Sequence, residues 1–133
     1  MSALANGLIT IQTRHAPKEA MRRLEAEVLA RDMAVFARID HAALAAAAGL
    51  TLRPTEVLVF GNPKGGTPLM QAEQTIGIDL PLKVLVWQDA TGATWISYND
   101  PHWLAARHAV GPELAPTLNA LAAALDAIAR AAA

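Results

Sequence analysis

Four polar residues at one end of a predicted hairpin have the chemistry to hold a small ligand. They are Lys83, Tyr98, Asn99 and Asp100. A lysine inside the apolar run 82–87 must emerge at a sheet face or find a partner, because an isolated buried ammonium is costly. We expect Asp100 to be that partner. A structural ion pair is the simpler interpretation, and a shallow site for a small anionic or carbonyl ligand is the alternative.

The segment Gly61–Pro68 is rich in glycine and proline and is expected to be a loop that follows a central strand. Its candidate ligand-binding residues are Asn62, Lys64 and Thr67, since loops at strand ends often carry sites. A nucleotide-binding loop is not expected, because Thr67 and Pro68 stand where that motif requires lysine and serine or threonine. The structural alternative makes Thr67 the N-cap, and Pro68 the first residue, of a short helix.

The four histidines, His15, His41, His102 and His108, do not form a metal-binding motif. His102 and His108 are six residues apart and lie on different faces of one helix. The chain has no cysteine, which excludes disulfides, thiolate zinc sites and cysteine nucleophiles. We therefore expect no metal and no cofactor, and His41 and His108 are expected to cap or end elements.

Hydrophobic periodicity predicts the elements that position these residues. Strands are expected over residues 8–13, 33–41, 55–60, 82–89 and 93–99. Helices are expected from residue 17 to about 30, over 42–48 with Gly49 as the C′ residue, over 69–75, over 101–108 with Asp100 as the N-cap, and from 114 onward. In the last helix Leu114, Leu118, Leu121, Leu125 and Ile128 form one apolar seam.

A two-residue turn at Thr91-Gly92 would fix the register of the hairpin formed by the last two strands. It pairs Trp87 with Ile96, Leu85 with Tyr98 and Lys83 with Asp100. This register places Trp87 and Trp95 on opposite faces of the sheet, so we do not expect them to form one stacking platform.

Length and charge limit the function classes. The 133 residues fit a single domain over 1–133, and 11 basic against 12 acidic residues leave a net charge of -1. Binding to nucleic acid or to a membrane is therefore not expected. Met1–Leu8 lacks the pattern of a signal peptide, so we expect a cytoplasmic protein. The C-terminal helix has a bland alanine surface that suits a subunit contact, and we expect a homodimer.

Three strings resemble the family of domains of unknown function 302. They are MAVFARIDHA at 33–42, LRPTEVLVFGNPKGGTPLMQ at 52–71, and IDLPLKVLVWQD with WISYNDP within 78–108. The resemblance covers about residues 7–130. It implies an α+β fold with a curved, mainly antiparallel sheet and helices packed on one face, similar to TATA-box-binding-protein-like folds and often homodimeric. The element order from periodicity is β-α-β-(α)-β-(α)-β-β-α-α. The family has no established reaction.

Three functions remain open. The first is a homodimeric cytoplasmic protein that binds a small-molecule ligand. The second is an enzyme that acts on a small carbonyl or anionic metabolite by acid–base chemistry, with Lys83 or a histidine as the reacting group. The third is a structural or interaction module without a ligand.

Overall fold

Five strands form one antiparallel sheet in the order β1-β5-β4-β3-β2. The structure is a computed structural model that describes residues 6–133, so most of the segment Met1–Leu8 lies outside the described residues. The strands are β1 (Leu8–Thr13), β2 (Ala34–Asp40), β3 (Thr55–Gly61), β4 (Leu82–Gln88) and β5 (Thr94–Asn99). The α+β class and the antiparallel sheet predicted from the sequence are confirmed.

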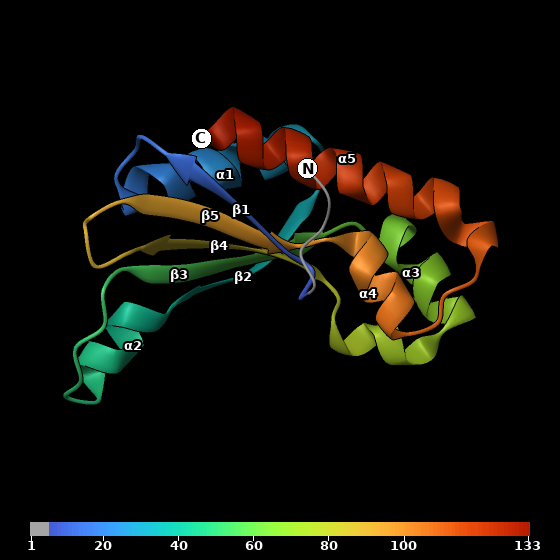
Figure 1. Ribbon diagram of the computed structural model, residues 1–133, viewed down its shortest axis with the longest axis horizontal. Helices are drawn as coiled ribbons and strands as arrows, with labels where there is room; N and C mark the ends of the chain where they lie inside the picture. The colour runs from blue at the N-terminus through green and yellow to red at the C-terminus, as the bar shows by residue number, and fades with distance from the viewer. Residues whose placement is uncertain (1–5) are drawn as a thin grey trace.

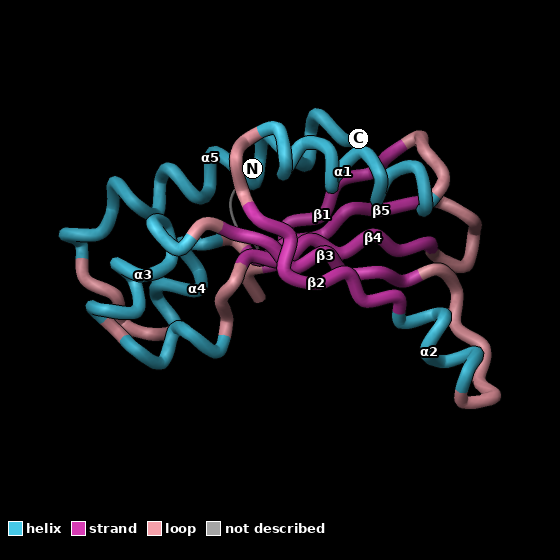
Figure 2. Tube along the Cα trace, turned by 180° about the vertical axis from the view of Figure 1, so that it is seen from behind, coloured by secondary structure: helices cyan, strands magenta, loops and turns pink. Residues whose placement is uncertain are grey.

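Five α-helices and two short 3₁₀ helices complete the described residues. They are α1 (Pro17–Ala30), α2 (His41–Ala47), α3 (Pro63–Ala72), η1 (Gln74–Ile78), α4 (Pro101–Arg107), η2 (Pro112–Leu114) and α5 (Ala115–Ala132). Figure 1 shows α1 and α5 lying over one face of the sheet, which confirms that helices pack on one face. Seen from behind, the opposite face has no helix across its centre, and α2 projects from one end of the sheet on that side (Figure 2).

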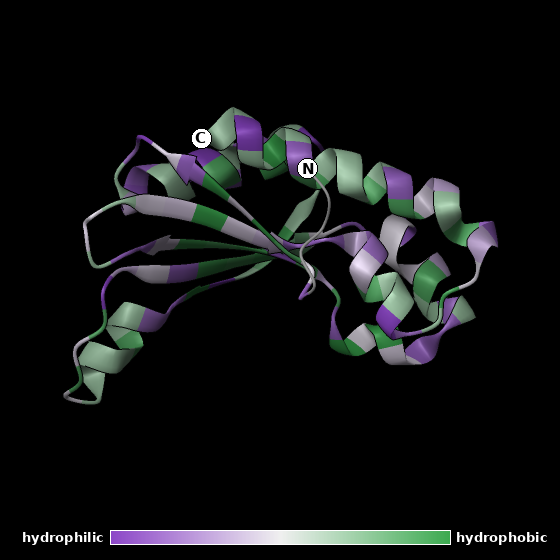
Figure 3. Cartoon of the chain, in the orientation of Figure 1, coloured by the Kyte–Doolittle hydropathy of each residue, from purple (hydrophilic) through white to green (hydrophobic). Residues whose placement is uncertain are grey.

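The main core lies between the sheet and the helix pair α1 and α5. The apolar stripe of α1 is fully buried at Met21, Leu24 and Val28, and α5 contributes Leu125 and Ile128. On the strands, every second residue points into this core, as expected for a sheet with one covered face. Hydropathy does not alternate in the same way: the middle of β3 and of β4 is continuously green in Figure 3, because residues on both faces of these strands are apolar.

The predicted register of the β4–β5 hairpin is wrong by one residue. Trp87 pairs with Trp95, and Leu85 pairs with Ser97. The Asp89 N–H donates a hydrogen bond to the Ala93 oxygen (2.9 Å), so the loop between these two residues contains three residues, 90–92. Gly92 has a φ of +87°. The two tryptophans consequently share a face and stack with ring centroids 6.2 Å apart.

The predicted loop Gly61–Pro68 is mostly helix. Asn62, not Thr67, is the N-cap, because its side chain accepts a hydrogen bond from the Lys64 N–H (2.9 Å) and Pro63 supplies a favourable first residue. Pro68 lies inside α3, where it removes one backbone donor. The other predicted caps are correct: Asp100 caps α4, and Gly49 follows α2 with a φ of +78°.

Candidate functional site

An apolar cavity of about 300 Å³ lies between α3, α5 and one end of the sheet. Its apolar wall includes Met33, Phe36, Met70, Leu80 and Leu121. Two of these are methionines, whose flexible side chains adapt to different shapes. Phe36 remains 53% exposed at the opening. A cavity of this size and lining suits a small, mainly apolar molecule.

Two glycines of α3 leave this space open. A Cβ atom on Gly66 would lie 3.6 Å from Leu80 Cδ1 and 3.8 Å from Met70 Cε, both ordinary contacts. A Cβ atom on Gly65 would lie 3.4 Å from Leu121 Cδ2. Larger side chains at these positions would extend into the cavity. The cavity therefore depends on residues that are poor helix formers in the middle of a helix.

The polar groups of the cavity come from the predicted site residues Asn62 and Thr67. The Oδ1 atom of Asn62 is used in the cap, so its amide N–H groups are what it can offer to a ligand. Lys64 is exposed and lies beside Thr67 in a shallow outer hollow, away from the apolar wall. The arrangement places hydrogen-bond donors and a nearby positive charge at one end of an apolar space.

The predicted ion pair between Lys83 and Asp100 is absent. The Nζ atom of Lys83 donates to the backbone oxygens of Asp79 and Pro81, each at 3.0 Å. Burial lowers the pKa of Lys83, and the nearby Asp79 carboxylate partly opposes this shift. Asp100 uses its carboxylate to accept a hydrogen bond from the His102 N–H (3.0 Å). The ion pair was inferred from the incorrect hairpin register.

The remaining predicted residues do not converge with Lys83. Tyr98 pairs with Val84 and points into the core, so it lies on the opposite sheet face from Lys83. Burial raises the pKa of the Tyr98 hydroxyl, with a smaller contribution from Asp126. Asn99 pairs with Leu8 at the end of β5. Of the seven candidates, only Asn62 and Thr67 line the apolar cavity.

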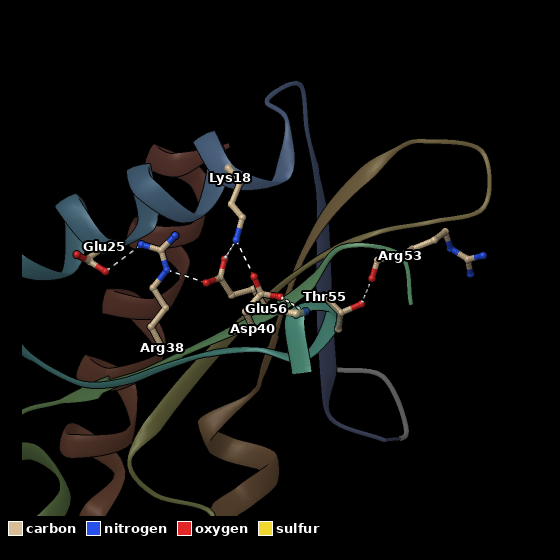
Figure 4. A network of polar contacts seen from close by, with 8 residues as sticks. Lys18, Glu25, Arg38, Asp40, Arg53, Thr55 and Glu56 are labelled. Carbon is tan, nitrogen blue, oxygen red and sulfur yellow. Dashed lines mark hydrogen bonds and ion pairs between the residues drawn. The ribbon is translucent and has the colours of Figure 1, made fainter. Parts of the chain in front are cut away.

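A charged network, not identified from the sequence, lies at the far end of the sheet (Figure 4). Glu56 is 8% exposed and accepts from Arg38 Nε (2.8 Å) and Lys18 Nζ (3.4 Å). Lys18 also binds Asp40 (2.8 Å), and this hydrogen bond is the main reason why the pKa of Lys18 is raised and that of Asp40 is lowered. Arg38 reaches Glu25 as well (3.4 Å). Both cations and all three carboxylates are paired within the network, which favours a structural role.

His108 belongs to a second polar cluster that joins η1 to α4. Its Nε2 atom lies 2.6 Å from Asp79, and its Nδ1 atom lies 2.9 Å from the Thr75 hydroxyl. Arg107 also contacts both carboxylate oxygens of Asp79. Both ring nitrogens of His108 are engaged, so it ends α4 and holds the two segments together. Across residues 6–133, no group of three or more His, Cys, Asp or Glu side chains is placed to hold a metal ion.

None of the helices described in the structure is long and apolar enough to cross a membrane.

The fold is similar to a crystal structure of an uncharacterised conserved protein, DUF302, from Bacillus stearothermophilus. The TM-score is 0.85 at 22% identity, over 97% of this chain and 100% of that one.

Longer relatives contain a region similar to this chain. This chain is 48% identical, over 110 residues or 83% of its own length, to two such proteins. They are named fluoride-specific ion channel FluC 1, from Brucella suis, and fluoride-specific ion channel FluC 2, from Brucella melitensis. The match covers 43% and 41% of those proteins, so the chain spans less than half of their length. The family model described as domain of unknown function DUF302 matches residues 9–128, and the chain belongs to that family.

Proposed function

We propose that this protein is a homodimer that binds a small molecule in the apolar cavity beside α3. The observation that carries the proposal is the 300 Å³ space, with an apolar wall and the Asn62 amide and Thr67 hydroxyl at its edge. Pockets with a few polar groups in an apolar lining are typical of small-ligand sites. The ligand that fits is compact and apolar, with a carbonyl or carboxylate group at one end.

The donors favour this ligand class. The amide of Asn62 and the hydroxyl of Thr67 can both donate to a carbonyl oxygen. Lys64, exposed near Thr67, would attract a carboxylate from solution. The apolar wall, in contrast, removes the apolar part of a ligand from water, which is favourable.

A thermal-shift screen with aliphatic and aromatic carboxylic acids and the matching ketones tests the proposal. A ligand at one hundred times its dissociation constant stabilises the fold by about 2.7 kcal/mol, which raises the melting temperature of a domain of this size by several degrees. Gly66→Met fills the cavity and should abolish the shift. Ala123→Met, at an exposed position of α5, is the matched control and should retain it.

Absence of a shift across the panel, or an equal shift in Gly66→Met, contradicts the proposal. If a compound binds and is also converted to a product, the enzyme hypothesis replaces simple binding.

The homodimer and a cytoplasmic location belong to the same proposal. Only 17% of the residues are charged, and several large apolar side chains are exposed. A partner subunit would cover such surface. Light scattering should give twice the chain mass of 14.0 kDa. Cell fractionation checks the location.

The similarity to TATA-box-binding-protein-like folds remains a prediction from the family resemblance and carries no claim of DNA binding.

A second candidate function follows from the longer relatives. This chain is 48% identical to part of a protein named fluoride-specific ion channel FluC 1. We therefore propose that it can also associate with such a channel. The test is co-purification of this chain with the remaining part of the Brucella suis protein. Recovery of both supports this function. Complete separation under mild detergent contradicts it.

A further inference from the structure

The segment of residues 41–52, here called the arm, is an apolar extension of the sheet. It consists of α2 and the turn after it, and it contains no Asp, Glu, Lys or Arg. None of the α2 residues is buried, and Leu44, Leu50 and Leu52 are 61%, 66% and 46% exposed. Figure 3 shows the arm in green over most of its length. Exposing three leucines on one projection is unfavourable unless something covers them.

A second uncovered apolar surface lies next to the arm. This surface, here called the open face, is the side of the sheet opposite α1 and α5 (Figures 1 and 2). One row across it joins Ile39, Val57 and Leu85, which are direct partners on β2, β3 and β4. The stacked pair Trp87 and Trp95 lies beside this row. All five side chains are partly exposed.

The dimensions of the open face indicate that it needs the arm to form a stable interface. Five strands of six or seven residues make a face about 24 Å by 21 Å, or about 500 Å². A stable interface buries about 800 Å² on each partner. The open face alone falls short of this area. An arm that contributes three leucines from each copy makes up much of the difference.

The chemistry of both surfaces favours a second copy of this chain over a lipid bilayer. A helix that binds a membrane surface usually carries lysine or arginine around its apolar side, and the arm has none. Lys83, the lysine on the open face, already binds two backbone oxygens. The arm is apolar. The open face is apolar over β2, β3 and β4 and continues onto the uncharged, mutually hydrogen-bonded Ser97 and Thr10. A two-fold axis would cover each surface of one copy with that of the other.

We propose that two copies pair through their open faces, with the arm of each copy lying against the open face of the other. This inference rests on the homodimer proposed above, and it adds the surface through which the dimer forms. The arm projects from the sheet on the same side as the open face, so a single partner can contact both surfaces at once (Figures 1 and 2).

Light scattering and sedimentation of the whole chain test the interface. The double variant Leu44→Lys with Leu50→Lys changes only exposed side chains and should weaken dimerisation at least tenfold. Leu29→Lys is the matched control, since Leu29 is 54% exposed on α1, on the covered side of the sheet. It should leave the dimer unchanged. Circular dichroism confirms that each variant is folded.

Charge complementation tests the reciprocal contact. Val57→Asp on the open face should also give monomers by itself. Mixing it with the double arm variant should restore a dimer, because one arm–face contact becomes a lysine–aspartate contact and the other is unchanged. If the wild-type chain is a monomer, the proposed homodimer and this interface are both wrong. If it is a dimer that the arm variants do not weaken, or if mixing restores nothing, only this interface is wrong.

Discussion

The cavity makes a quantitative prediction about two leucines one turn apart on α5. Leu125 is 1% exposed and packs in the main core, whereas Leu121 is partly buried and lines the cavity. Replacing each leucine with alanine removes the same atoms from the same helix. The difference in cost therefore reports the surroundings of each side chain.

For Leu125→Ala we expect a loss of about 3–4 kcal/mol in the free energy of unfolding, because a new void forms in a close-packed core. For Leu121→Ala we expect a loss of about 1 kcal/mol. One side of Leu121 already faces empty space, so fewer contacts are lost and an existing cavity is merely enlarged. For a domain of 133 residues these values correspond to decreases in melting temperature of about 10 °C and about 3 °C.

Urea unfolding followed by circular dichroism measures both values under identical conditions. A ligand that occupies the cavity should bind Leu121→Ala with altered affinity and Leu125→Ala with nearly normal affinity. Equal losses of stability in the two variants would show that the cavity is closed in solution, and the proposed binding site would then be wrong.

Three further predictions concern polar groups. The Thr91 hydroxyl and the Trp95 indole hold the pKa of Asp89 far below its usual range, so its contribution to stability is present at neutral pH and is lost as the pH falls below about 4. Asp89→Asn should make the urea midpoint less dependent on pH between 5 and 2. Glu56→Gln should cost about 1–3 kcal/mol because it weakens the hydrogen bonds of a buried carboxylate, whereas Asp126→Asn, at an exposed pair, should change stability by less than about 0.5 kcal/mol. Asp100→Ala should cost about 1 kcal/mol through loss of the α4 cap. A double-mutant cycle with Lys83→Met should give a coupling energy close to zero. A large coupling energy would support the Lys83–Asp100 ion pair, which the geometry contradicts.

Local patterns in the sequence were sufficient to predict most elements. The i, i+3 and i+7 apolar spacing of α1, the alternation of the strands and the Asp100-Pro101 cap each depend on neighbouring residues. The hairpin register failed for a reason that is also local. The Asp89 carboxylate accepts bonds from the backbone N–H groups of Thr91 and Ala93, and this lengthens the turn by one residue. A one-residue change moves every side chain of a strand pair to a different partner.

Long-range contacts explain most of what was missed at the candidate site. Glu56 and Lys18 are 38 residues apart, and His108 and Asp79 are 29 residues apart. No spacing rule brings such pairs together before the strand order is known. The cavity is similar, since Met33, Met70 and Leu121 come from three separate elements. Asn62 and Thr67 could be predicted because they lie close together in one glycine- and proline-rich segment that directly follows a strand.

The composition of α3 links the local sequence to the proposed site. Gly65, Gly66 and Pro68 are among the poorest residues for a helix interior, yet all three lie within Pro63–Ala72. Alanine at the glycine positions would favour the helix, so stability alone does not account for this sequence. Gly65 and Gly66 face the cavity, where a longer side chain would occupy the space beside Leu121 and Leu80. Positions at which the local preference is broken and the fold gains nothing are where functional requirements are expected. The glycines of α3 thus support the binding proposal independently of the size of the cavity.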